Sequence, residues 1–254
     1  MTTPPTLRVW LGGSFDPVHV GHVAMLQHVY QCLHQAVPDW PIVASFLPTA
    51  GSPLKNSPTA NAHRLAMLEC VLADVPDLAL DDSEIHQSPP VYTIDTLTAF
   101  AKRYPDDVRI FVLGGDSAAS LSRWRHGDVL LDWANLWVMA RTGQSHMTPH
   151  ALATTLAQFF AAKQNILTKQ ACDLINSRTN LIFIDDFVPP MVASRDIRAW
   201  LADLGQMDRA CRHATAPRDA LLAMLNAALP AAVLAYILQH GLYGTNPHSS
   251  GHPR

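Results

Sequence analysis

GGSFDPVHVGH, residues 12–22, is the most informative stretch of this chain. A short apolar run precedes it at 7–11, and an apolar-periodic stretch follows it at 23–33. The run predicts a buried strand, and the periodic stretch predicts an amphipathic helix. The glycine pair at 12–13 permits a tight turn that a ligand can approach closely. We therefore expect a strand–loop–helix unit with a binding site at its turn.

Two histidines, His19 and His22, stand three residues apart around Gly21 at the start of the predicted helix. Residues three apart share a helix face, so both imidazoles should lie on one side. The start of a helix also offers unpaired N–H groups and the positive end of the helix dipole. A pair of histidines on a helix is more often a packing or surface feature. The preceding strand and glycine pair favour a polyphosphate site instead.

Short apolar runs alternate with longer helical patterns along the chain. Strands are predicted at 8–11, 42–47, 78–80, 110–113, 136–140 and 181–184. Helices are predicted at 20–34, 61–74, 92–104, 118–123, 149–160, 194–203, 218–228 and 231–239. The alternation favours an α/β fold, a doubly wound parallel sheet with helices on both faces and right-handed crossovers.

Four short segments follow predicted strands and should converge at one edge of the sheet. They lie at 12–13, 48–52, 114–116 and 141–143. In open α/β sheets, ligands bind outside the carboxyl ends of the strands. The binding site is therefore expected at this edge.

The composition narrows the classes of function. The net charge is −3 and the pI is about 6.5, so a protein that coats nucleic acid is not expected. The four cysteines are scattered without a Cys-x-x-Cys pair, which favours reduced thiols in the cytoplasm over a zinc or redox site. The polar N-terminal residues precede an apolar run that is too short for a secretory signal peptide.

One stretch, 221–238, is long enough to suggest a membrane span. Asn226 and Pro230 interrupt it, and proline suits the first turn of a new helix. Two core helices and no membrane partner are therefore expected. We expect a single domain over residues 1–244, with a candidate helical insertion at 144–180 and a disordered tail at 245–254.

The motif at 12–22 resembles the signature of the His-x-Gly-His nucleotidyltransferase superfamily, which carries it on a Rossmann-like sheet. More closely, the chain resembles the family of bacterial nicotinate-nucleotide adenylyltransferases. Seven further blocks carry this resemblance in the family's order. They are FLPTAGSPLK at 46–55, NAHRLAMLECVLAD at 61–74, LDDSEIHQSPPVYTIDTL at 80–97, IFVLGGDSAASLSRW at 110–124, ANLWVMARTG at 134–143, VASRDIRAWL at 192–201 and HGLYG at 240–244.

The resemblance implies a reaction in NAD biosynthesis. The adenylyl group of ATP would pass to nicotinate mononucleotide, giving deamido-NAD and pyrophosphate. Mg²⁺ would be carried mainly by the ATP phosphates, with no metal site built from protein side chains. Two alternatives remain: adenylyl transfer to nicotinamide mononucleotide or another small phosphate, and a non-catalytic nucleotide-binding relative. The oligomeric state is left open.

The resemblance also implies residues for the ATP side. His19 and His22 would contact the ATP phosphates, with His22 stabilising the transition state. Backbone approach to the nucleotide would come from the residues of the first loop, Gly12, Gly13, Ser14 and Phe15. Two roles are open for Asp16: it belongs to this nucleotide-binding loop, or its carboxylate caps the N-terminus of the helix.

A second nucleotide signature is implied at 192–198. Ser194 would be the helix N-cap, and Arg198 would supply a guanidinium one turn later. Ala193 stands where the family usually has serine, and Arg195 stands where threonine is common, so one hydroxyl contact is missing. A capped helix with surface arginines is the alternative reading.

The resemblance assigns the remaining residues to the acceptor and its phosphate. Lys55 would bind phosphate or is simply a solvated loop lysine, and Leu54 stands where the family often has histidine. Arg141 follows the predicted strand at 136–140, where its guanidinium is well placed for a phosphate. The backbone N–H groups of Tyr92 and Thr93 would read the nicotinate carboxylate. Trp124 would stack on the pyridine ring, or is simply packed in the core. Gly114 and Asp116 would lie near the ribose hydroxyls.

Overall fold

The computed structural model describes residues 5–51, 59–140, 148–209 and 216–245. The chain divides into two compact units. Unit 1 comprises Met1–Gly13, Met25–Asn56 and Asp77–Pro189, and unit 2 comprises Ser14–Ala24, Ser57–Pro76 and Pro190–Arg254. The expectation of a single domain with an insertion at 144–180 stays a prediction, and residues 246–254 of the expected tail lie outside the described residues.

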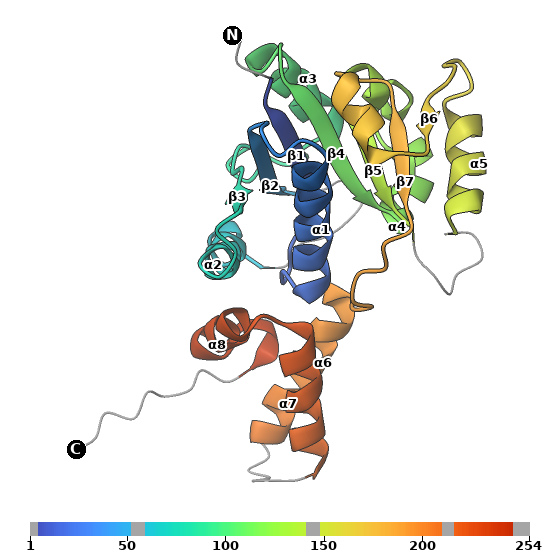
Figure 1. The fold of residues 1–254 in the computed structure, drawn as a ribbon. Helices are drawn as coiled ribbons and strands as arrows, with labels where there is room; N and C mark the ends of the chain where they lie inside the picture. The colour runs from blue at the N-terminus through green and yellow to red at the C-terminus, as the bar shows by residue number, and fades with distance from the viewer. Residues whose placement is uncertain (1–4, 52–58, 141–147, 210–215, 246–254) are drawn as a thin grey trace. The chain divides into compact units, whose positions relative to one another are not determined.

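Unit 1 is built on a parallel sheet. Among the described residues the sheet has seven strands, in the order β3-β2-β1-β4-β5-β7-β6 (Figure 1). The strands are β1 Leu7–Gly13, β2 Ile42–Pro48, β3 Leu78–Leu80, β4 Val108–Gly114, β5 Asn135–Met139, β6 Leu167–Thr168 and β7 Ile182–Asp185. This arrangement confirms the predicted α/β fold with a doubly wound parallel sheet.

The strand order reverses between β1 and β4. β1 pairs with β2 on one side and with β4 on the other, so the chain leaves the two central strands in opposite directions. The register sets Gly13 opposite Pro48, and Gly114 opposite Met139. The carboxyl ends of β1, β2, β4 and β5 therefore meet at one edge, which is the place where such sheets bind ligands.

Helices cover both faces of the sheet in unit 1. The helices are α3 Thr93–Arg103, α4 Gly115–Ala119, α5 Pro149–Phe159 and the part of α1 (Val20–Ala36) that belongs to this unit. Buried side chains of α3, α4 and α5 form one core cluster with Leu136 and Val138 of β5. Trp137 points to the opposite face because side chains alternate along a strand. There its ring meets His28 of α1 edge-on, at 6.5 Å between ring centroids.

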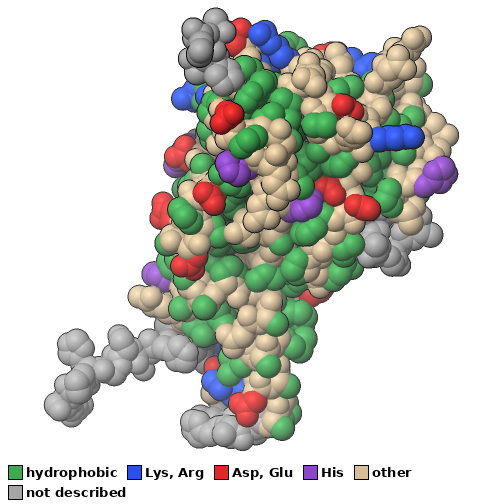
Figure 2. Space-filling view, viewed as in Figure 1, with side chains coloured by type: hydrophobic (Ala, Val, Ile, Leu, Met, Phe, Trp, Pro, Cys, Tyr) green, Lys and Arg blue, Asp and Glu red, His purple; other side chains and the backbone are tan. Residues whose placement is uncertain are grey.

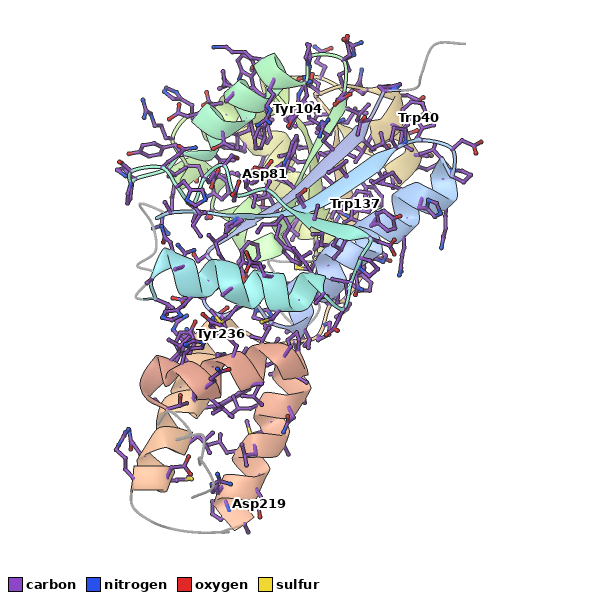
Figure 3. All side chains as sticks on the ribbon, turned by 90° about the vertical axis from the view of Figure 1, so that its left-hand side faces the viewer. Trp40, Asp81, Tyr104, Trp137, Asp219 and Tyr236 are labelled. Carbon is purple, nitrogen blue, oxygen red and sulfur yellow. The ribbon has the colours of Figure 1, made fainter. Side chains whose placement is uncertain are left out.

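Unit 2 is helical. Besides the N-terminal end of α1 it contains α2 Asn61–Leu72, α6 Ser194–Arg209, α7 Ala216–Ala228, α8 Ala231–His240 and a short 3₁₀ helix, η5 Leu242–Gly244. Tyr236 lies between α8 and α2, and its hydroxyl is 2.9 Å from Nδ1 of His63 (Figure 3). Arg218 of α7 forms an ion pair with Asp208 of α6 at 2.9 Å. Side-chain contacts thus join α2 to α8 and α6 to α7.

The six predicted strands and seven of the eight predicted helices are confirmed, with ends shifted by a few residues. The helix predicted at 118–123 was placed wrongly. A helix, α4, begins directly after β4 at Gly115, and a separate 3₁₀ turn, η1, covers Leu121–Arg123. The two-residue strand β6 was missed because so short a run has no periodicity.

The apolar stretch at 221–238 forms two helices, α7 and α8, with Pro230 at the N-cap of the second. None of the helices in the described ranges is long and apolar enough to cross a membrane. On the face that Figure 2 presents, acidic, basic and histidine side chains are interspersed.

Two glycines at the carboxyl ends of β1 and β4 give a matched test of packing at the site edge. A Cβ on Gly12 would lie 2.7 Å from Cζ of Phe111, whereas a Cβ on Gly114 would meet nothing within 4 Å. Gly12→Ala should lower the free energy of unfolding by about 1–3 kcal/mol, because the Phe111 ring must shift. Gly114→Ala should leave it unchanged or raise it by about 0.4–1 kcal/mol. Urea unfolding of both variants checks this, and equal effects would contradict it.

Candidate active site

The first loop, residues 14–19, ends at the two histidines in unit 2. Helix α1 begins at Val20, and the carbonyl of His19 accepts the N–H groups of His22 and Val23 at 3.0 and 3.3 Å. The rings of His19 and His22 are stacked, with centroids 3.7 Å apart and planes 23° apart. The prediction that both imidazoles lie on one side of the helix start is confirmed.

Phe15 and Gly21 shape the surroundings of this pair. Phe15 has a positive φ of 49°, a backbone conformation that costs energy for a bulky residue. Its buried ring meets the ring of His22 edge-on at 5.0 Å. A Cβ on Gly21 would lie 2.9 Å from the carbonyl oxygen of Pro190 and 3.1 Å from the His19 ring. Glycine is therefore needed here for the His19 ring to lie against the helix start.

Three side chains from two other helices hold the backbone of the first loop. Arg64 of α2 donates from Nη1 to the carbonyl oxygen of Ser14 at 2.6 Å. Arg198 of α6 donates from Nη1 to the carbonyl oxygen of Asp16 at 2.5 Å. The hydroxyl of Ser194, also in α6, donates to the carbonyl oxygen of Pro17 at 3.0 Å. Three carbonyl groups of the loop thus accept hydrogen bonds from donors that lie far from it in the sequence.

Arg64 was not found by the sequence analysis, although it is fully buried. Its Nη2 donates to Oδ1 of Asn61 at 2.5 Å, and burial lowers the pKa of its guanidinium. In the sequence, Arg64 is a single arginine in a helical pattern, which favours a surface position. Only its contact with Ser14, 50 positions away, shows that it differs from a surface arginine.

One expectation about helix caps, for Ser194, is wrong, and so is one of the two alternatives left open for Asp16. The N-cap of α6 is Ala193, whose carbonyl accepts the N–H groups of Asp196 and Ile197, and Ser194 is the first helical residue. Ser194 instead uses its hydroxyl on Pro17. Asp16 lies four residues before α1 begins and accepts a hydrogen bond from Tyr243, so the reading as a helix cap does not hold. In both cases a long-range partner replaces the local one.

In unit 1, the segment around Tyr92 forms the start of α3. Tyr92 is the N-cap residue, and its carbonyl accepts the N–H groups of Asp95 and Thr96. The N–H groups of Tyr92 and Thr93 precede the first bond within the helix, as at every helix start. The guanidinium of Arg125 lies 4.7 Å from the centroid of the Tyr92 ring. The backbone here offers donors and the positive end of a helix dipole.

Trp124, Gly114 and Asp116 also lie in unit 1. Trp124 is half-buried, packs against the same core cluster as Tyr92, and donates its indole N–H to Oγ of Ser120 at 3.3 Å. Gly114 ends β4 and is the N-cap of α4, and Asp116 is exposed in the first turn of that helix. Gly12 and Gly13 end β1. Two predicted site residues, Lys55 and Arg141, lie outside the described residues.

Glu84 is a second residue that the sequence analysis missed. It is buried, and Oε1 accepts the hydroxyl of Thr96 at 2.6 Å. Thr49 also bonds to this carboxylate, and the N–H of Thr49 donates to the carbonyl of Gly13 at 3.0 Å. The N–H of Val91 donates to the carbonyl of Gly51 at 3.0 Å. Glu84 therefore ties the first turn of α3 to the ends of β1 and β2.

Metal-binding side chains do not cluster in the parts of the chain that the structure describes. Nowhere in them do three or more histidine, cysteine, aspartate or glutamate side chains come together as a metal site. Two guanidinium groups, those of Arg64 and Arg198, instead contact the loop that ends at His19. Cations together with backbone N–H groups suit a bound anion.

Comparison with known proteins gives consistent matches over most of the chain. The model of a family described as cytidylyltransferase-like matches residues 10–199. A probable nicotinate-nucleotide adenylyltransferase of Pseudomonas syringae pv. tomato is 30% identical over 255 residues, covering 100% of both chains. A protein of the same description from Aeromonas salmonicida is 31% identical over 234 residues, covering 92% of this chain and 95% of the relative.

Solved structures share the fold at lower identity. The structure of Plasmodium falciparum nicotinic acid mononucleotide adenylyltransferase complexed with NaAD matches with a TM-score of 0.63 and 17% identity. The match covers 95% of this chain and 98% of that one. At this identity the likeness establishes the fold alone, which is Rossmann-like as expected.

The buried carboxyl of Glu84 should make stability depend on pH. Burial is the main cause that raises the pKa of Glu84 above its ordinary value of 4.5. As the pH rises above 4.5, Glu84 loses its proton in the unfolded chain before it does so in the folded protein. The free energy of unfolding therefore falls until the pH passes the raised pKa of the folded state. Glu84→Gln removes this loss. The difference in unfolding free energy between variant and wild type should therefore shift in favour of the variant from about pH 4.5 upward.

Urea unfolding between about pH 4 and pH 8, a range that includes the usual stability maximum at about pH 5–8, measures this difference. Glu69→Gln, at an exposed position of α2, is measured alongside as a control for the substitution itself. A difference between Glu84→Gln and wild type that is independent of pH would contradict the assignment.

Proposed function

The chain belongs to the family of bacterial nicotinate-nucleotide adenylyltransferases, and from that premise we propose that it transfers the adenylyl group of ATP to nicotinate mononucleotide. The products are deamido-NAD and pyrophosphate. The observation that carries the proposal to this chain is the stacked pair His19 and His22 at the start of α1, on a loop that Arg64 and Arg198 hold from other helices.

The reaction needs no nucleophile from the protein. A phosphate oxygen of the mononucleotide attacks the α-phosphorus of ATP in line. The bond from the α-phosphorus to the oxygen bridging it to the β-phosphorus breaks, and pyrophosphate leaves with the electron pair. The protein has to hold two anions in line and stabilise the charge on the leaving group, mainly by electrostatics.

The ATP side of the proposal uses the first loop and the start of α6. His19 and His22 bind the ATP phosphates, and His22 donates to the charge that develops on the leaving group. The backbone of Gly12, Gly13, Ser14 and Phe15 approaches the nucleotide. Arg198 spends one donor on the carbonyl of Asp16 and has a planar fork of five N–H donors in total. Its proposed role is therefore both to hold the loop and to bind phosphate, with Ser194 beside it.

The acceptor side uses residues of unit 1. The N–H groups of Tyr92 and Thr93 at the start of α3 bind the nicotinate carboxylate, and Trp124 stacks on the pyridine ring. Two further groups lie at the carboxyl end of β4, where Gly114 and Asp116 bind the ribose. Lys55 and Arg141 remain part of the proposal as phosphate binders.

Mg²⁺ is the proposed cofactor. Mg²⁺ is commonly held by one or two carboxylates together with substrate phosphates and water. Asp16 fits this pattern, because it is buried and its Oδ2 makes no hydrogen bond to any residue that the structure describes. The ATP phosphates and water would still supply most of the ligands, with Asp16 as a single contact from the protein, and the bound cation would neutralise charge on the phosphates. A cytoplasmic location, inferred from the scattered cysteines, completes the proposal.

His22→Ala should abolish most of the turnover while the fold is kept. Loss of one preorganised donor to a transition state costs about 100- to 1000-fold in kcat. Pyrophosphate release from ATP and nicotinate mononucleotide measures this effect, and circular dichroism monitors the fold. The exposed His34 at the other end of α1 supplies the control, and His34→Ala should keep wild-type turnover. Near-normal turnover in folded His22→Ala would remove His22 from the mechanism.

The acid mononucleotide should be preferred over the amide. The N–H donors at the start of α3 gain charge-assisted hydrogen bonds to a carboxylate. An amide presents an NH₂ group to one of them and leaves a buried donor unpaired, at a cost of about 1–3 kcal/mol or about ten- to a hundredfold in kcat/KM. The two mononucleotides are compared at the same ATP and Mg²⁺ concentrations.

Trp124→Ala tests the proposed stacking on the pyridine ring. It should raise the KM for the mononucleotide more than the KM for ATP. Equal specificity constants for acid and amide would favour a broader adenylyltransferase instead. Absence of pyrophosphate release with either mononucleotide would favour a non-catalytic nucleotide-binding relative.

A further inference from the structure

The HGLYG segment at 240–244 has no role in the proposal so far, although it was one of the blocks that carried the family resemblance. In unit 2, α8 ends at His240 and the chain turns sharply. Gly241, Tyr243 and Gly244 all have positive φ, at 61°, 56° and 82°. For the non-glycine Tyr243, this is an unfavourable conformation that its surroundings must hold in place. Residues 241–245 are called the C-terminal hook below.

The C-terminal hook is fastened to α6. A Cβ on Gly205 would lie 2.0 Å from the carbonyl oxygen of Gly244, so the hook packs directly on the helix backbone at this glycine. Arg209 donates from Nη1 to the same carbonyl at 3.0 Å. The hydroxyl of Thr245 donates to the carbonyl of Leu242 at 2.8 Å. These contacts fix the hook on the helix that also carries Ser194 and Arg198.

Tyr243 connects the C-terminal hook to the first loop. Its hydroxyl donates to Oδ1 of Asp16 at 2.7 Å, across 227 positions of sequence. The phenol can only donate to a carboxylate oxygen, so this hydrogen bond is charge-assisted. Asp16 is therefore held twice, by Tyr243 at its carboxylate and by Arg198 at its carbonyl.

Asp16 differs from an ordinary structural carboxylate. Only 3% of the residue is exposed, yet Oδ2 accepts no hydrogen bond from any described residue. Buried polar atoms almost always have partners, so an unsatisfied carboxylate oxygen indicates a partner that arrives with a ligand. A cavity of about 460 Å³ in this unit is lined by Tyr243 and Arg198, the two residues that bond to Asp16, together with His63 and Thr59.

We propose that Tyr243 is a positioning residue for adenylyl transfer. It orients the carboxylate of Asp16 so that Oδ2 is kept for the ATP–Mg²⁺ complex, and it thereby keeps the loop in front of His19 in its binding conformation. This inference rests on the proposed function and extends it to the C-terminal hook. The hook acts on the ATP side, because its hydrogen bond reaches Asp16 of the first loop.

Tyr243→Phe tests the proposal, because it removes a single hydroxyl and keeps the ring. The KM for ATP should rise about tenfold, as expected for loss of one hydrogen bond to a charged group, with the KM for the mononucleotide unchanged. Calorimetric titration with ATP and Mg²⁺, without acceptor, should show a similar loss of affinity. Tyr236→Phe is the matched control, since its hydroxyl bonds to His63 instead of Asp16, and it should behave as wild type.

If Tyr243→Phe is unstable, Asp16→Asn provides a second test of the proposal. It should weaken ATP binding in the same direction, and Tyr243→Phe combined with Asp16→Asn should weaken it no more than Asp16→Asn alone. Additive losses would overturn the proposal, as would wild-type ATP binding in folded Tyr243→Phe. The calorimetric measurement needs no acceptor. It therefore tests the hook even if the wild type turns over a different mononucleotide, whereas only the turnover assay bears on the proposed reaction.

Discussion

The backbone of the first loop has to be held in one conformation, and the rest of the site depends on this constraint. The loop carries Phe15 in an unfavourable backbone region and ends in two stacked imidazoles. A loop of this kind stays in place only if its surroundings determine its conformation. Arg64 and Arg198 provide this through short hydrogen bonds to two of its carbonyl groups. Preorganisation of this kind keeps donors aimed at a phosphate without reordering during the reaction.

The two units divide the proposed work between them. Unit 2 contains the histidine pair, the arginines that hold the first loop, and the C-terminal hook. Unit 1 contains the start of α3, the end of β4 and the glycines that end β1. The residues proposed for the mononucleotide lie in unit 1, and most of those proposed for ATP lie in unit 2. The reaction requires two separately bound anions to be held in line.

Local patterns in the sequence predicted the elements and the first loop. The alternation of apolar runs located the strands, and the spacing of His19 and His22 placed both rings on one side. What the sequence did not reveal were contacts between distant residues. Arg64, Glu84 and Tyr243 each look like an ordinary helix, loop or tail residue, and their partners lie 50, 12 and 227 positions away. The role of Ser194 was misjudged for the same reason, since a local cap was assumed where Pro17 is the partner.

The central claim is that the adenylyl group passes directly from ATP to the mononucleotide on this protein. ATP labelled at the α-phosphorus follows that group through the reaction. With nicotinate mononucleotide and Mg²⁺ present, the account predicts that the label appears in a dinucleotide in equal amount to the pyrophosphate released, and that protein quenched in acid during turnover carries none. Label retained on the protein, or pyrophosphate released without labelled dinucleotide, would contradict it.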